Sequence, residues 1–328
     1  MILCKSSTKE RNESFDPIDF EQLIDSTINK PARYMGNELG VLSRDWNLAE
    51  VHWSLIYPEI YEIGASNLGH IILYSILNKV PRQLCDRAYL PGKDLAEALR
   101  KKSQPLFAVE SRRPLLAFEI LGFSLGYELG ATNILEILSL SEIPLYASQR
   151  GDLPINEALA PPLIFAGGPT ATSNPEPFAA FFDFFALGDG EELLPEIGLI
   201  IAESKKRKLT RSKLLLELSE IPGVYVPTLY KVQNNRKSNL NSSSIHKRVL
   251  RRVATPLPQY SMGLVPNIET IHDRLTIEIR RGCTRGCRFC QPGMLTRPAR
   301  DVEPEEVIKS VEIGMKKTGY SDFSLLSL

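Results

Sequence analysis

The sequence predicts an α/β fold: a doubly wound parallel sheet over residues 49–230, followed by the first βαβ unit of a second domain over 271–328. Two observations favour this class. Short apolar runs alternate with amphipathic helical stretches, which is typical of parallel sheets covered by helices on both faces. Near the end of the chain, a strand, a cysteine-rich loop, a helix and a second strand follow one another. The chain has 328 residues, enough for two domains with cores of their own.

The predicted elements of the first domain follow in order. Residues 1–48 are polar and mixed, and we expect an N-terminal arm. Apolar runs bounded by turn residues predict strands at 51–58, 105–111, 119–126, 162–168 and 181–188. Helical spacing of apolar residues predicts helices at 70–80, 93–102 and 128–141.

Residues 231–270 are predicted to connect the two domains. The first part, 231–248, is rich in Asn, Ser and Lys and has too little apolar surface to pack, so we expect a mobile loop or insertion. The rest, up to 270, is punctuated by proline and indicates a connecting arm.

The last segment predicts one right-handed βαβ unit with parallel strands. Leu275, Ile277 and Ile279 alternate with polar residues, as in a strand. The stretch 303–319 predicts a helix, with Pro304 in its first turn and Gly319 closing it. Residues 322–328 predict a second, buried strand.

Three of the five cysteines, Cys283, Cys287 and Cys290, fall in the loop after the first strand of this unit. In parallel α/β architectures, ligands gather at the carboxyl ends of strands. Three thiolates with three and two intervening residues can hold three corners of an iron–sulfur cube, which leaves one iron without a protein ligand. Gly282 and Gly286 allow tight turns and close approach of the backbone to a cofactor.

Four arginines surround these cysteines: Arg280, Arg281, Arg285 and Arg288. We expect an electropositive setting that favours thiolates and offsets an anionic cluster. The alternative is that the arginines form only a solvated basic face.

Two other interpretations of the cysteines are less favoured. A zinc site needs four ligands, and the remaining candidates, Cys4, Cys85 and the four histidines, all lie outside the loop. A disulfide in so short a loop would leave one thiol over.

Composition excludes some function classes. Lys+Arg and Asp+Glu balance at 39 each, which gives no support for nucleic-acid binding. The N-terminus lacks the apolar region of a signal peptide, and no long apolar run predicts a membrane span. An odd number of cysteines, three of them clustered, favours a metal site in a reducing, cytoplasmic compartment.

The spacing Cys283-X3-Cys287-X2-Cys290, with Phe289 before the last cysteine, resembles the signature of the radical S-adenosylmethionine (SAM) superfamily. The resemblance implies that the three cysteines ligate a [4Fe-4S] cluster, whose open iron binds SAM, and that Phe289 lies near the adenine. It also implies reductive cleavage of SAM to a 5′-deoxyadenosyl radical, with an electron donor such as flavodoxin or ferredoxin.

Upstream stretches such as "YEIGASNLGHIILYSILN" and "NPEPFAAFFDFFALGDGEE" extend the match. Together they resemble an uncharacterised bacterial family of B12-binding-domain/radical SAM fusion proteins, so the first domain is similar to a cobalamin-binding, Rossmann-like module. The chain departs from the Asp-X-His-X-X-Gly motif of the best-known modules, because His70 follows its glycine. His70 is therefore interpreted as a helix-start residue, and cobalamin binding stays open.

Two glycine loops follow predicted strands at the same edge. Gly167, Gly168, Gly188 and Gly190 are candidates for holding anionic groups of a cofactor through backbone N–H groups. The alternative is that these glycines only satisfy turn dihedrals.

A complete (β/α)8 barrel needs about 200 residues or more, far beyond the 271–328 segment. We therefore expect an N-terminal portion of a radical SAM protein. The main alternative is a truncated, non-catalytic cobalamin- or ligand-binding module with a vestigial cluster loop. A weaker one is an RNA-modifying enzyme similar to methylthiotransferases.

Overall fold

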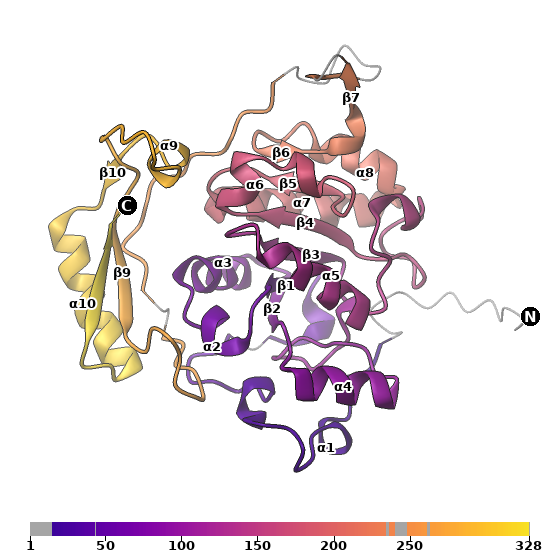
Figure 1. Cartoon of the computed structure of the whole chain (residues 1–328), viewed down its shortest axis with the longest axis horizontal. Helices are drawn as coiled ribbons and strands as arrows, with labels where there is room; N and C mark the ends of the chain where they lie inside the picture. The colour runs from indigo at the N-terminus through magenta and orange to yellow at the C-terminus, as the bar shows by residue number, and fades with distance from the viewer. Residues whose placement is uncertain (1–14, 43, 234–235, 240–247, 261–262, 328) are drawn as a thin grey trace, which may run out of the picture.

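A six-stranded sheet forms the centre of the molecule in the computed structural model, which describes residues 15–42, 44–233, 236–239, 248–260 and 263–327. The strand order is β2-β1-β3-β4-β5-β6 (Figure 1). The strands are β1 Val51–Tyr57, β2 Gln83–Tyr89, β3 Ile120–Ser124, β4 Leu163–Gly167, β5 Phe184–Ala186 and β6 Val224–Tyr225. Strands β1 to β5 are parallel and β6 is antiparallel to β5. The predicted α/β fold class is confirmed.

Helices cover both faces of this sheet, as in a doubly wound fold. One face packs against α3 Leu68–Lys79, α7 Gly190–Arg207 and α8 Arg211–Leu218, whose apolar side chains share a core with Trp53 and Phe165. The other face packs against α4 Lys93–Lys102 and α5 Gly130–Leu140. Short helices complete this part: α1 Phe20–Leu23, α2 Tyr61–Gly64 and α6 Pro169–Ser173.

Strand β2 was not predicted, and the predicted strand at 105–111 was wrong. Residues 105–111 form only an isolated bridge, between Phe107 and Pro114. The reason is electrostatic: β2 carries the buried Arg87, which sequence patterns assign to a surface. Its guanidinium binds Glu110 and Glu38, each at 2.7 Å, so a charge in the strand is compensated by two distant segments.

The second part is a three-stranded sheet in the order β10-β9-β11, with one helix packed against it (Figure 1). Its elements are β9 Leu275–Arg281, α9 Pro292–Leu295, β10 Arg300–Asp301, α10 Pro304–Thr318 and β11 Phe323–Ser327. Strands β9 and β11 are parallel, which confirms the predicted βαβ unit. Helix α10 has Pro304 at its first position and Gly319, with φ of +74°, as its C-cap. The short β10 was not predicted.

One further prediction needs correction: strand β11 is not buried, since Phe323, Leu325 and Leu326 are each about half exposed. The segment expected to be a mobile loop or insertion contains part of an antiparallel strand pair, β7 Tyr230–Gln233 and β8 Arg236–Asn239, which was not predicted. The rest of that tract, 240–247, lies outside the described residues, as do residues 1–14 of the predicted arm.

A buried ionic cluster beside the sheet contacts the arm through Trp46. His52 Nδ1 lies 2.9 Å from Glu119 Oε2, and its Nε2 lies 2.8 Å from the Trp46 carbonyl oxygen. Lys205 Nζ donates to Glu119 Oε1 at 2.6 Å, and the Trp46 ring stacks on the imidazole.

We expect Glu119→Gln to lower the free energy of unfolding by about 3 kcal/mol at pH 7, because it leaves Lys205 without its buried counter-charge and removes the carboxylate that faces His52. Burial disfavours the carboxylate, but His52 and Lys205 outweigh it and hold the Glu119 pKa well below its ordinary value. Because the Glu119 pKa is lower in the folded than in the unfolded protein, the carboxylate stabilises the fold above about pH 4.5. This stabilisation is lost on acidification. Urea unfolding from pH 7 downwards should therefore show the two proteins converging. Glu203→Gln, at an exposed position, is the control and should change stability by less than about 0.5 kcal/mol; equal stability of Glu119→Gln and wild type would contradict the prediction.

Candidate functional site

The carboxyl ends of β1, β3, β4 and β5 surround a cavity of about 420 Å³. Its walls are mainly apolar, with Leu55, Leu73, Phe165 and Leu194 from the sheet and from helices α3 and α7. Seven of the lining residues are glycines: Gly69, Gly122, Gly126, Gly167, Gly168, Gly188 and Gly190. This is the sheet edge at which the sequence predicted a ligand, and the glycines make the space.

The four glycines at and after the ends of β4 and β5, Gly167, Gly168, Gly188 and Gly190, line this cavity, but two of them have a backbone role. A side chain at Gly168, where φ is +105°, would lie 2.9 Å from the Leu125 carbonyl oxygen. A side chain at Gly188, where φ is +94°, would lie 2.1 Å from the Arg252 carbonyl oxygen. Turn dihedrals and close chain approach therefore require glycine at both positions, whether or not a ligand is bound.

His70 lies in the first turn of α3 and its side chain borders the cavity. Its backbone N–H donates to Asn67 Oδ1, the N-cap of the helix, at 3.0 Å. Burial, with a smaller effect from Arg87, lowers the His70 pKa to about 3, so the ring is neutral. No hydrogen-bond partner lies near its Nε2 within the described part of the chain.

The three clustered cysteines lie in the loop that runs from β9 to α9. All three are free thiols; Cys283 and Cys290 are partly buried and Cys287 is exposed. The Cys290 N–H donates to the Cys287 carbonyl oxygen at 3.1 Å, and the Arg285 N–H donates to Cys283 Sγ at 3.4 Å. An open hollow of about 510 Å³ lies beside Cys283 and is also lined by Arg251, Thr284 and Arg297.

A glycine that the sequence did not single out separates two of these thiols. A Cβ at Gly293 would lie 3.3 Å from Cys290 Sγ and 3.8 Å from Cys283 Cβ. Gly282 has φ of +90°, and a Cβ there would lie 2.5 Å from the carbonyl oxygens of Thr296 and Pro298. Gly286 is open, with Arg297 Nη2 at 3.7 Å as the nearest atom to a Cβ. Gly293 therefore leaves room between the thiols, and Gly282 lets the chain double back.

The three thiols of the loop are side chains of the chemical kind that an iron–sulfur cluster takes as ligands. No three His, Cys, Asp or Glu side chains among the described residues gather as single-ion ligands would. A cube presents its irons at separate corners, so its thiolates are spread, and thiolates are the ligands it prefers. Cys85 is buried in β2, away from the loop, while Cys4 lies outside the described residues.

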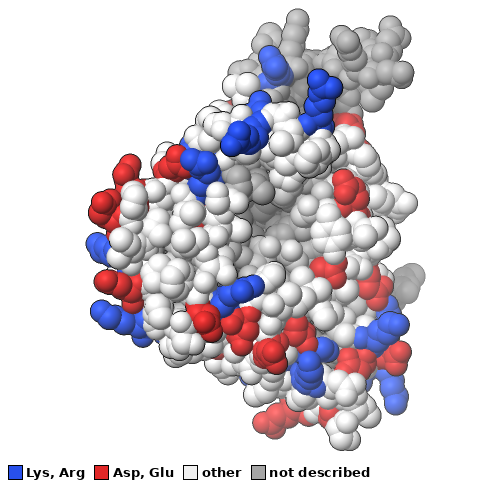
Figure 2. All heavy atoms as spheres, turned by 60° about the vertical axis from the view of Figure 1, so that its left-hand side comes forward, with Lys and Arg blue, Asp and Glu red and all other residues white. Residues whose placement is uncertain are grey.

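The four arginines predicted to form one electropositive setting divide into two pairs. Arg280 binds Asp301, and Arg281 binds Asp189, Glu191 and Glu278. Arg285 and Arg288 are exposed and form no ion pair with any described carboxylate. Lys and Arg side chains gather above the central hollow of the face shown in Figure 2.

The cysteine loop lies against the cavity edge of the six-stranded sheet. Gln291 Nε2 donates to Ser173 Oγ at 2.6 Å, which joins α9 to the end of α6 (Figure 1). Arg300 Nη1 donates to Asp189 Oδ2 at 2.6 Å, in the turn between β5 and α7. Phe289 is 92% exposed, so this side chain is free on the outer side of the loop.

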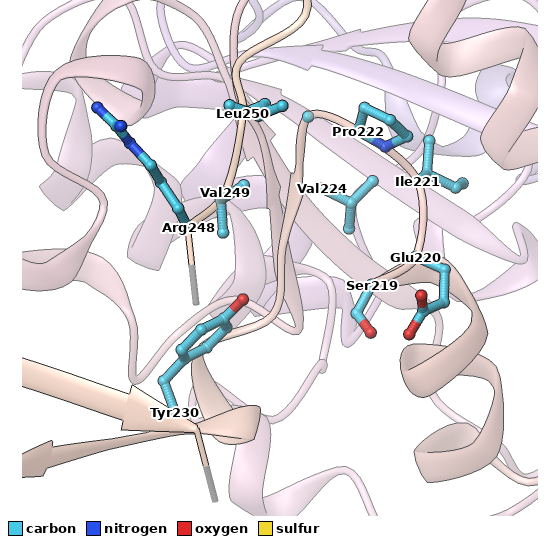
Figure 3. Close-up of a pocket in the computed structure, with 10 residues that line it drawn as sticks. Ser219, Glu220, Ile221, Pro222, Val224, Tyr230, Arg248, Val249 and Leu250 are labelled. Carbon is cyan, nitrogen blue, oxygen red and sulfur yellow. The ribbon is translucent and has the colours of Figure 1, made fainter. Parts of the chain in front are cut away.

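A second pocket, of about 130 Å³, lies between the turn after α8 and residues 248–250 (Figure 3). Ile221, Pro222, Val224 and Val249 line it. It contains none of the predicted site residues and lies away from the carboxyl ends of the strands that form the cavity.

Sequence reasoning missed three residues of this site: Gly293, Asp189 and Arg300. Asp189 stands in the glycine loop "LGDGEE", between two glycines that were singled out. Its position between them was the one available signal. No local pattern marks Gly293 or Arg300.

In the described part of the chain, no helix is long and apolar enough to span a membrane.

Comparison with known proteins relates the first part of the chain to radical SAM proteins. Residues 69–227, just under half of the chain, match the family described as "Radical SAM proteins, N-terminal". No curated protein matches the sequence.

Two solved structures match the chain over most of its length. The cobalamin-dependent S-adenosylmethionine radical enzyme OxsB, with aqua-cobalamin and S-adenosylmethionine bound, has a TM-score of 0.51 and 16% identity, and the match covers 84% of this chain and 34% of OxsB. The radical S-adenosylmethionine methyltransferase TsrM from Kitasatospora setae has a TM-score of 0.48 and 12% identity over 84% of this chain and 47% of TsrM. The chain thus spans between a third and a half of the length of these proteins. At 16% identity, the likeness to OxsB concerns the fold alone.

Proposed function

We propose that this chain carries the cofactor-binding part of a radical SAM enzyme: a [4Fe-4S] cluster on the cysteine loop and a cobalamin in the sheet-edge cavity. The observation that carries the proposal is the position of the loop. Three free thiols lie at the carboxyl end of a parallel strand, and the loop that bears them is bound to the edge where the cavity opens. We keep the predicted division into arm 1–48, first domain 49–230, connection 231–270 and second domain 271–328.

Cys283, Cys287 and Cys290 would be the three protein ligands of the cluster. When bound, the cluster would supply the electron that cleaves S-adenosylmethionine. The protein's own part is to hold three thiolates apart, which Gly293 permits, and to turn the chain at Gly282. Phe289 is free to lie against the adenine of SAM. The open space around Gly286 gives that glycine no packing role in the loop.

Cobalamin is the larger of the two proposed cofactors, and the cavity would receive part of it. The apolar walls and the glycine-lined edge suit an apolar ring of such a cofactor, and the lining residues include no Lys, Arg, Asp or Glu. Backbone groups at Gly167, Gly168, Gly188 and Gly190 would face it. Neutral His70 borders the cavity but does not stand in an Asp-X-His-X-X-Gly motif, so we propose binding without an axial histidine.

An acidic electron-transfer protein such as flavodoxin or ferredoxin is the proposed partner. The cluster must receive its electron from outside, and Arg285 and Arg288 flank the exposed Cys287 without carboxylate partners in the described chain. Exposed positive charge near a redox centre favours an acidic partner. We place this chemistry in the cytoplasm, since the three thiols must stay reduced until the cluster is assembled.

A non-catalytic ligand-binding module is the second candidate. The cavity alone favours it, since the same walls could serve binding without any cluster. The two candidates differ in their predictions: the radical SAM enzyme binds iron and cleaves SAM, and the binding module does neither.

The test is anaerobic reconstitution with iron and sulfide, followed by metal analysis. We expect about four irons per chain for the wild type and a loss of nearly all of them when Cys283, Cys287 and Cys290 are changed to alanine together. Cys85→Ala, at a buried position in β2, is the matched control and should keep its iron. Unchanged iron in the triple variant would refute the cluster. Cobalamin binding without iron uptake would identify the binding module, and 5′-deoxyadenosine formed from SAM would exclude it.

A further inference from the structure

Asp189 is the point at which the cysteine loop and the cavity edge meet. It lies between Gly188 and Gly190, which both line the cavity. Its Oδ2 accepts hydrogen bonds from the Ala254 N–H at 2.8 Å and from Arg300 Nη1 at 2.6 Å, and its Oδ1 lies 3.2 Å from Arg281 Nη1. The side chain is only 12% exposed. Burial opposes its ionisation, but these donors outweigh burial and lower the Asp189 pKa.

The two arginines that share Asp189 stand at the two ends of the cysteine loop. Arg281 is the last residue of β9, and Arg300 is the first residue of β10. The two are directly opposite each other in the antiparallel pair of β9 and β10. Like charges at opposite positions destabilise a strand pair. A carboxylate between the two guanidinium groups offsets this repulsion at the paired ends of β9 and β10.

Arg300 also holds the chain that packs over the start of the loop. It donates to the carbonyl oxygens of Thr296, at 3.1 Å, and Pro298, at 3.0 Å. These are the two oxygens that would lie 2.5 Å from a side chain at Gly282, the residue before Cys283. Fixing Arg300 therefore fixes the backbone beside the first cysteine.

We propose that Asp189 is the positioning residue of the cysteine loop. By binding Arg281 and Arg300 at the two ends of the loop, it fixes the position of the loop relative to the cavity edge. The purpose of this positioning rests on the proposed function, because the loop would carry the cluster and the cavity the second cofactor. The contacts of Asp189 with Arg281 and Arg300 form in the protein without cofactors.

The two arginines depend on Asp189 to different degrees. Arg281 has two other carboxylate partners, Glu191 at 2.5 Å and Glu278 at 2.8 Å. For Arg300, Asp189 is the one carboxylate partner among the described residues. Loss of Asp189 should therefore loosen residues 296–301 and the facing turn at Gly282 more than β9 itself.

Hydrogen exchange of the 328-residue chain without metal tests the proposal. In Asp189→Asn we expect amides of 282–301 to exchange about tenfold faster or more, the equivalent of one charge-assisted hydrogen bond in the local opening equilibrium. Asp152→Asn is the matched control: Asp152 accepts from the Ser212 N–H and hydroxyl at 2.6 and 2.9 Å, far along the chain from the loop. It should leave 282–301 unchanged. Exchange in β1 and β3 reports whether each variant is folded.

Arg300→Gln removes the same contact from the other side and should accelerate the same amides. Equal exchange of 282–301 in wild type, Asp189→Asn and Arg300→Gln would overturn the proposal.

The reconstituted protein gives a second readout, which a purely structural role would leave alone. With iron content at the wild-type level, we expect the midpoint potential of the cluster to become more positive in Asp189→Asn, because a carboxylate beside the loop is lost. A potential equal to that of Asp152→Asn would overturn the assignment of Asp189 to the cluster's surroundings. Absence of iron in the wild type would refute the proposed function, while the exchange comparison would still decide the role of Asp189.

Discussion

Replacing Gly293 with valine is expected to lower the iron retained after reconstitution by at least about tenfold, the scale seen when residues next to metal ligands are changed. The Cβ alone would lie 3.3 Å from Cys290 Sγ and 3.8 Å from Cys283 Cβ. The two methyl groups of valine extend further and would occupy the space between the thiols. The fold should survive, because Gly293 lies in a helical turn whose dihedrals valine can adopt.

Gly286→Val is the matched control for this prediction. It places the same branched side chain in the same loop, where the nearest atom to the new Cβ is Arg297 Nη2 at 3.7 Å. We expect iron content within about twofold of the wild type, since that flexible side chain can move aside. If both variants load iron equally well, the space between Cys283 and Cys290 is not where the cluster binds. The comparison also separates the glycine that the sequence singled out from the one that the structure adds.

The parts of the fold that sequence predicted are those with local causes. Helix α10 needed only Pro304 in its first turn, acidic residues beside it and Gly319 after its last turn, and all lie within one short segment. Strands β1, β3 and β4 are apolar runs that end at turn residues, so their existence was also a local matter.

The errors concern residues whose partners are distant in the sequence. β2 was missed because Arg87 looks like a surface residue until Glu38 and Glu110 are placed beside it. β11 was expected to be buried because an apolar run does not reveal what covers it, and in the described chain its side chains are half exposed. Both errors come from reading burial from one segment alone.

The candidate site shows the same division. The three cysteines could be found because their spacing is local, and the cavity edge because parallel strands end together. The role of Asp189 could not be predicted beyond its place between two glycines, because its partners Arg281 and Arg300 follow it by about a hundred residues. Gly293 could not be found either, since a glycine becomes informative only when the atoms around its missing side chain are known.

Gly126→Trp is expected to weaken cobalamin binding by at least about tenfold, the equivalent of one overpacked side chain in a binding site. Gly126 lines the cavity, and a Cβ there meets no atom within 4 Å, so the indole would enter open space without displacing the backbone. Aquacobalamin added to wild type and variant, with binding followed by absorbance and gel filtration, measures the change. The expected loss is specific to a ligand that occupies the cavity.

Leu129→Trp separates this effect from a general cost of adding an indole. Leu129 is 80% exposed, lies three residues further along the same loop, and is not part of the cavity lining. It should bind cobalamin as the wild type does. If Gly126→Trp also binds cobalamin normally, cobalamin is held elsewhere, and the glycines at this edge serve only the turns and close packing of the backbone. If Gly126→Trp loses cobalamin but keeps its iron, the cavity and the cysteine loop are two separate sites. This is the expected result, since none of the three cysteines lines the cavity.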